Sequence, residues 1–126
     1  MPGVLIVEDD NELREMLKVA LLRRKYTVIE AANGKEAIAH FKPNLTDLVV
    51  TDLIMPEEDG LKVIMKLKET KPSMRIIAIS GGGKAGPGSY LNLAKALGAD
   101  AIFPKPFSTN DLIVKIEELL SVEQQT

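Results

Sequence analysis

The chain of 126 residues contains no cysteine and no tryptophan, and its only histidine is His40. Without cysteine the protein can form no disulfide, and it offers no thiolate for nucleophilic catalysis or for binding zinc. A Ser-His-Asp triad would have to use His40. This histidine lies within a short helical pattern, and we expect it to be a bystander.

Long apolar runs and a strong net charge are also missing. No stretch approaches the roughly 20 apolar residues of a membrane-spanning helix, and the apolar run from Val4 meets Glu8 too soon for a signal peptide. The net charge of −2 favours neither nucleic acid nor a membrane as a partner. We therefore expect a cytoplasmic protein without direct DNA binding, built as one domain over residues 1–126.

Short apolar runs alternate with helical patterns along the chain. The expected strands are 4–7, 27–31, 48–52, 75–80 and 101–103, and the expected helices are 11–25, 35–41, 61–70, 90–97 and 109–121. This alternation predicts an α/β protein with a parallel sheet and right-handed crossovers. We expect residues 122–126 to fray.

Local signals refine the helices. Asp10 or Asn11 can cap the first helix, Ser108 or Thr109 can cap the last, and Gly98 closes the fourth. The residues expected on the core-facing sides of the first and third helices are Leu13, Met16, Leu17, Ala20, Leu21, Leu61, Ile64 and Met65.

Polar residues follow four of the five strands. The first strand is followed by Glu8 and Asp9, the third ends in Asp52, the fourth ends in Ser80, and Lys105 comes after the fifth. The carboxyl ends of parallel strands share one edge, so these side chains can converge there. Each also has a structural alternative: the acids can cap helices or turns, Ser80 can be a loop serine, and Lys105 can be solvated.

Three carboxylates in one place need positive charge. Two like charges about 4 Å apart cost roughly 4 kcal/mol at an effective dielectric constant of about 20. Lys105 supplies one positive charge, and a divalent ion would supply two more. The available ligands are hard oxygens, which favours Mg²⁺, or Mn²⁺, over zinc. Such a site suits phosphoryl transfer, with Asp52 attacking phosphorus to give an aspartyl phosphate.

Four motifs resemble those of the receiver domains of bacterial two-component response regulators. They are Leu5-Ile6-Val7-Glu8-Asp9-Asp10, Asp52-Leu53-Ile54-Met55-Pro56 with Asp59-Gly60, Ser80-Gly81, and Lys105-Pro106-Phe107. Each motif alone is weak, but all four in this order are specific, and the resemblance covers about residues 3–121. It implies a flavodoxin-like, doubly wound, five-stranded parallel sheet with strand order 2-1-3-4-5.

The resemblance also implies ligands and partners. Asp52 is expected to accept a phosphoryl group from the phosphohistidine of a sensor histidine kinase or phosphotransfer protein. Asp9, Asp52 and the backbone carbonyl of Ile54 are expected to bind Mg²⁺ directly, and Glu8 to help directly or through water. The signal is expected to leave through a downstream protein effector, so the chain is a signalling module and not a turnover enzyme.

Two more roles follow from the resemblance. Lys105 and Ser80 are expected to hold oxygens of the phosphoryl group, and the Lys105–Pro106 peptide bond is expected to be cis. Two alternatives stay open. A degenerate receiver would bind partners without phosphorylation. A phosphatase with an aspartyl-phosphate intermediate usually has a second aspartate two positions after the nucleophile, and this chain has Ile54 there.

The sequence departs from the family in two places. The segment from Gly81 to Gly88 holds five of the nine glycines, and we expect a mobile loop that becomes ordered on phosphorylation. It formally matches a G-x-G-x-x-G pattern, but it follows the fourth strand, where a dinucleotide fold does not place that pattern. Ile102 falls where many receivers carry a switching Tyr or Phe, so signal output is expected to use different coupling.

Overall fold

The computed structural model describes residues 2–54, 59–81 and 87–124. Among these residues, five strands alternate with five helices. The strands are β1 (Gly3–Val7), β2 (Thr27–Ala31), β3 (Leu48–Asp52), β4 (Arg75–Ser80) and β5 (Ala101–Pro104). The helices are α1 (Asn11–Arg23), α2 (Gly34–His40), α3 (Gly60–Thr70), α4 (Pro87–Ala96) and α5 (Thr109–Gln124).

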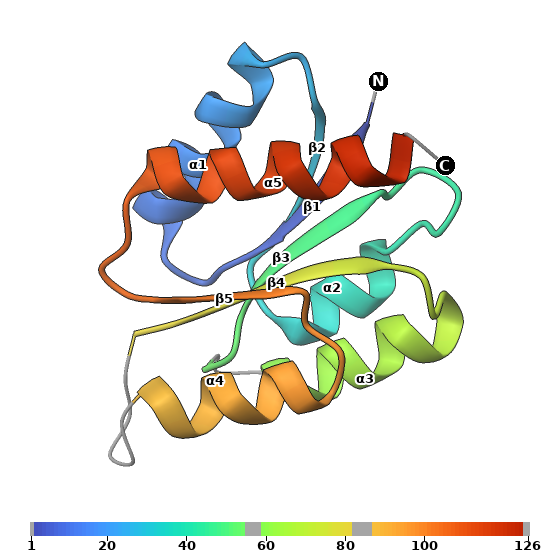
Figure 1. Ribbon diagram of the computed structural model, residues 1–126, viewed down its shortest axis with the longest axis vertical. Coiled ribbons are helices and arrows are strands. Elements are labelled where there is room, and N and C mark those ends of the chain that lie inside the picture. Colours follow the sequence, from blue (N-terminus) through green and yellow to red (C-terminus); the bar gives the residue numbers. More distant parts are fainter. Residues whose placement is uncertain (1, 55–58, 82–86, 125–126) are drawn as a thin grey trace.

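The strands form one parallel sheet in the order β2-β1-β3-β4-β5. Helices α1 and α5 cover one face of this sheet, and α2, α3 and α4 cover the other (Figure 1). This arrangement confirms the predicted flavodoxin-like architecture. The order reverses beside β1, so β1 and β3 lie together at the centre, where such sheets bind ligands.

Two apolar clusters, one on each face, hold the layers together. Along β1, Val4 and Ile6 pack with α1 and α5, whereas Leu5 and Val7 pack with the helices of the opposite face. All four side chains are fully buried. The unbroken apolar sequence of the strand follows from this, since both faces of the sheet are covered.

Helix ends follow the predicted capping signals. The Asp10 carboxylate accepts hydrogen bonds from the amides of Glu12 and Leu13, and the Ser108 hydroxyl accepts one from the amide of Asp111. Beyond α4, Gly98 has a φ of +114°, a conformation that favours glycine after a helix.

Several predicted helix boundaries were wrong, among them the end of α1, which closes at Arg23 and not at Lys25. Helix α2 lies one residue earlier than expected, and α4 begins at Pro87, although Pro87 and Gly88 were assigned to the loop. Proline suits the first position of a helix because its missing N–H needs no partner there. Helix α5 continues to Gln124, where we expected fraying, because this stretch has no helix breaker. The loop prediction for 82–86 lies outside the described residues.

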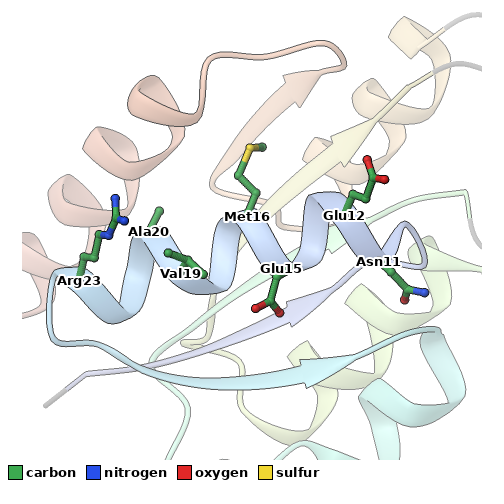
Figure 2. A pocket seen from close by; sticks show the side chains of 7 residues that line it. All are labelled: Asn11, Glu12, Glu15, Met16, Val19, Ala20 and Arg23. Carbon is green, nitrogen blue, oxygen red and sulfur yellow. The ribbon is translucent and has the colours of Figure 1, made fainter.

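Two methionines assigned to the core are on the surface. Met16 is 48% exposed and Met65 is 54% exposed. Met16 lies on the outer side of α1 beside Val19 and Ala20, where a groove of about 610 Å³ runs along the helix (Figure 2). Only part of the apolar stripe on α1, including Leu17 and Leu21, reaches the core.

None of the helices in the described part of the chain is long and apolar enough to cross a membrane.

Candidate functional site

The carboxyl edge of the sheet gathers the acidic residues. Val7 of β1 pairs with Thr51 of β3, so Glu8, which follows β1, lies beside Asp52, the last residue of β3. Carboxylate oxygens of Glu8, Asp9 and Asp52 lie within 4.8 Å of one another. The convergence expected from the sequence is therefore present in the structure.

Burial divides these three carboxylates. Glu8 is fully buried and Asp52 is 3% exposed, whereas Asp9 is exposed to solvent. Burial raises the pKa of Glu8 to about 7, because hydrogen bonds from Lys105 and from the Asp10 amide, which favour the charged form, offset only part of the desolvation. The negative charge of Asp52 raises this pKa further. Additional positive charge at the site would stabilise the ionised cluster.

Lys105 bridges the two buried carboxylates. Its Nζ lies 2.8 Å from Glu8 Oε1 and 3.0 Å from Asp52 Oδ2. Burial alone would lower the pKa of Lys105, but its hydrogen bonds and charge interactions with Glu8 and Asp52 together raise it. The lysine therefore stays cationic. The peptide bond from Lys105 to Pro106 is cis, as expected.

The glycine after β4 leaves room for this lysine. A Cβ atom on Gly81 would lie 3.0 Å from Lys105 Cδ and 3.3 Å from its Cβ. The Lys105 amide also donates a hydrogen bond of 2.8 Å to the Ser80 carbonyl. The end of β4 thus positions both the backbone and the aliphatic stem of Lys105.

Ser80 and Ile54 complete the predicted set. The Ser80 hydroxyl is buried, and within the described residues it has no hydrogen-bond partner. Ile54 contributes its amide, which donates to Asp52 Oδ1 over 3.2 Å. The metal-binding role of the Ile54 carbonyl stays a prediction.

A cavity of about 460 Å³ adjoins Lys105 and lies between the start of α1 and the segment that leads into α5. It is lined by Asp10, Leu13, Met16, Gly81, Lys105, Pro106 and Phe107. The cavity thus reaches Lys105, whereas Glu8, Asp9 and Asp52 are not among the residues that line it.

The donor set fits a hard divalent cation. Glu8, Asp9 and Asp52 offer carboxylate oxygens, and ionised they carry three negative charges against the single positive charge of Lys105. Oxygen ligands of this kind suit Mg²⁺, which binds through one or two carboxylates and keeps several waters.

Sequence reasoning gave no role to Arg14 in α1. Its guanidinium donates a hydrogen bond of 2.7 Å to the carbonyl oxygen of Glu8. No motif indicates this contact, because it depends on how the chain passes from β1 into α1.

A tight backbone contact supports the strand that carries Asp52. A Cβ atom on Gly60 would overlap the carbonyl oxygen of Asp52 and the Cα of Leu53. We expect Gly60→Ala to lower the free energy of unfolding by about 1–3 kcal/mol, because backbone atoms must move. Urea denaturation measures this loss. Met65→Ala on the exposed side of the same helix should change it by less than about 0.5 kcal/mol, and equal stability of the two variants would contradict the prediction.

Comparisons with known proteins agree with this geometry. The family model described as "Response regulator receiver domain" matches residues 4–117. The chain is 38% identical over 122 residues to the sensor kinase CckA of Brucella abortus, covering 93% of this chain and 12% of that protein. It is 32% identical to the transcriptional regulatory protein ResD of Bacillus subtilis, covering 98% of this chain and 50% of ResD. The chain thus spans about half the length of ResD and a smaller part of CckA.

A solved structure shows the same similarity in three dimensions. The response regulator TrrA of Thermotoga maritima, determined in complex with Mg²⁺-BeF, is 31% identical to this chain. It superposes with a TM-score of 0.80 over 94% of this chain and 99% of TrrA. From its sequence, its strand order and these similarities, the chain belongs to the family of response regulator receiver domains.

Proposed function

We propose that this chain is the phosphoacceptor of a two-component system, in which Asp52 takes a phosphoryl group from a phosphohistidine with the help of Mg²⁺. The observation that carries the proposal is the position of Asp52. It lies within 4.8 Å of two further carboxylates and 3.0 Å from the Lys105 ammonium. This combination supports a nucleophile beside a cation that can neutralise a transferring phosphoryl group.

The residues have distinct roles in the transfer. An oxygen of Asp52 attacks phosphorus, the bond from phosphorus to the donor nitrogen breaks, and an acyl phosphate forms. Lys105 and the Ser80 hydroxyl donate hydrogen bonds to phosphoryl oxygens, while the Ile54 amide orients the Asp52 carboxylate. When bound by the acidic cluster, Mg²⁺ supplies positive charge to the phosphoryl oxygens.

The partners and the setting complete this proposal. The donor is a sensor histidine kinase or phosphotransfer protein, and the signal passes to a protein effector without direct DNA contact. Residues 1–126 act as one receiver domain in the cytoplasm, and the domain assists its own phosphorylation and dephosphorylation without turning over a substrate. The kinship with a protein named as a sensor kinase and with one named as a transcriptional regulator supports this pathway.

Incubation with acetyl phosphate and Mg²⁺, followed by intact-mass measurement, tests the proposal. We expect the mass to rise by one phosphate, and the gain to disappear with EDTA. A chain that gains no phosphate would be a degenerate receiver, and steady release of inorganic phosphate at enzymatic rates would indicate a phosphatase.

The metal site gives a separate prediction. Asp9→Asn is expected to abolish Mg²⁺-dependent phosphorylation and leave the fold intact, because the Asp9 side chain is exposed and its loss leaves no buried group unpaired. Intact mass measures phosphorylation, and circular dichroism measures the fold. Glu12→Gln, which removes an exposed charge in the first turn of α1, is the matched control and should be phosphorylated normally. Undiminished phosphorylation of Asp9→Asn would refute the assignment.

A further inference from the structure

Arg14 makes three polar contacts beside the acidic cluster without belonging to it. Its Nη1 donates to the Glu8 carbonyl at 2.7 Å, its Nη2 donates to Asn11 Oδ1 at 2.7 Å, and its Nε lies 3.3 Å from Glu30 Oε1. The side chain is 18% exposed, although it carries a charge. The guanidinium is therefore held between the end of β1, the start of α1 and the edge strand β2.

The Glu8 carbonyl lies where the sheet ends. Pairing of β1 with both neighbours ends at Val7, and the Glu8 amide still donates to the Ala31 carbonyl at 3.0 Å. A buried carbonyl without a partner is costly, and Arg14 supplies that partner through a charge-assisted hydrogen bond, which is about twice as strong as a neutral one. Arg14 thereby fixes the plane of the peptide that joins Glu8 to Asp9.

The position of the Asp9 carboxylate depends on this peptide more than the positions of the Glu8 and Asp52 carboxylates do. The Glu8 carboxylate is held by Lys105 and by the Asp10 amide, and Asp52 is held by Lys105 and the Ile54 amide. Asp9 is exposed, and its carboxylate accepts no hydrogen bond from the residues that the structure describes. The direction of its side chain is consequently set by the backbone that Arg14 holds.

The charge of Arg14 is already compensated. Glu30 lies within ion-pair distance of Arg14, and Lys18, which shares Glu30, has a second acidic partner in Glu15. The influence of Arg14 on the acidic cluster is therefore mainly geometric, and the planar fork of the guanidinium matters more than its charge.

We propose that Arg14 is a positioning residue for the metal site: by holding the Glu8 carbonyl, it aims the Asp9 carboxylate at the oxygens of Glu8 and Asp52. The inference rests on the metal site of the proposed function but not on phosphorylation. Groups that orient metal ligands typically change metal affinity by about 10–100-fold when they are removed.

The test is direct Mg²⁺ titration of the whole chain, followed by amide chemical shifts. We expect Arg14→Gln to raise the Mg²⁺ dissociation constant about tenfold. Arg14→Lys keeps the charge but lacks the fork, so it should resemble Arg14→Gln and not the parent chain. The matched control is Arg24→Gln at the C-cap that follows the same helix, which breaks an exposed ion pair with Glu117 and should leave the constant unchanged.

A second readout separates positioning from general stability. With acetyl phosphate, the Mg²⁺ concentration at half-maximal phosphorylation should rise about tenfold in Arg14→Gln, while the rate at saturating Mg²⁺ stays within about threefold.

A purely structural role would lower stability to urea and leave Mg²⁺ affinity of the folded chain unchanged, which would overturn the inference. Recovery of affinity by Arg14→Lys would also overturn it. If the parent chain binds Mg²⁺ normally but gains no phosphate, the proposed function fails and the affinity comparison still decides the role of Arg14.

Discussion

Asp52→Asn is expected to gain no phosphate from acetyl phosphate and Mg²⁺ under conditions in which the parent chain gains one. The amide is a poor nucleophile, and the other carboxylates are badly placed to replace it. Glu8 is fully buried and paired with Lys105. Asp9 is exposed and lies in the segment that follows β1. Intact-mass measurement should show the full loss, and peptide mapping of the parent chain should place the phosphate on Asp52.

The same variant should remain folded. In the metal-free protein, Lys105 faces two buried carboxylates, and Asp52→Asn leaves it paired with Glu8 alone. Asp59→Asn is a close control, because Asp59 caps α3 and asparagine caps a helix equally well. This control should be phosphorylated like the parent chain. A phosphate on Asp52→Asn would show that another residue is the acceptor.

The fold could be predicted from the sequence because its signals are local. The strand Leu48–Asp52 has an apolar run that is typical of a sheet covered on both faces, and the structure places it at the centre. Boundaries at the helix ends were less accurate. Pro87 can end a loop or begin a helix, and only its surroundings decide between the two.

The site could be predicted as far as chain topology determines it. Parallel strands bring their carboxyl ends together, so the convergence of Asp9 and Asp52 followed from the strand assignments. The contact from Arg14 to the Glu8 carbonyl did not follow, because a backbone acceptor leaves no mark in the sequence. Met16 was misplaced because the apolar stripe on its helix is wider than the face that meets the sheet.

Lys105→Met should have the second large effect, on stability as well as on phosphorylation. Methionine keeps an apolar stem beside Gly81 but removes the cation between Glu8 and Asp52, whose side chains are 0% and 5% exposed. Removing one partner of a buried ion pair leaves an uncompensated charge. We expect the free energy of unfolding in EDTA to fall by about 3 kcal/mol, measured by urea denaturation. Phosphorylation at saturating Mg²⁺ should slow at least about 100-fold, because a donor to the phosphoryl oxygens is lost.

Two comparisons separate lost charge from lost packing. Lys105→Met leaves the carboxylates of Glu8 and Asp52 unpaired. Adding Glu8→Gln removes one of these two charges and should recover most of the stability without recovering phosphorylation. Lys115→Met is the matched control, because Lys115 forms only an exposed ion pair with Glu118, and such pairs contribute about 0–1 kcal/mol. Mg²⁺ should stabilise Lys105→Met by RT ln(1 + c/Kd), where c is the free Mg²⁺ concentration, since the ion binds the folded chain and supplies the missing positive charge. If the double variant is no more stable than Lys105→Met, the loss comes from packing, and Lys105 does not act by neutralising the two carboxylates.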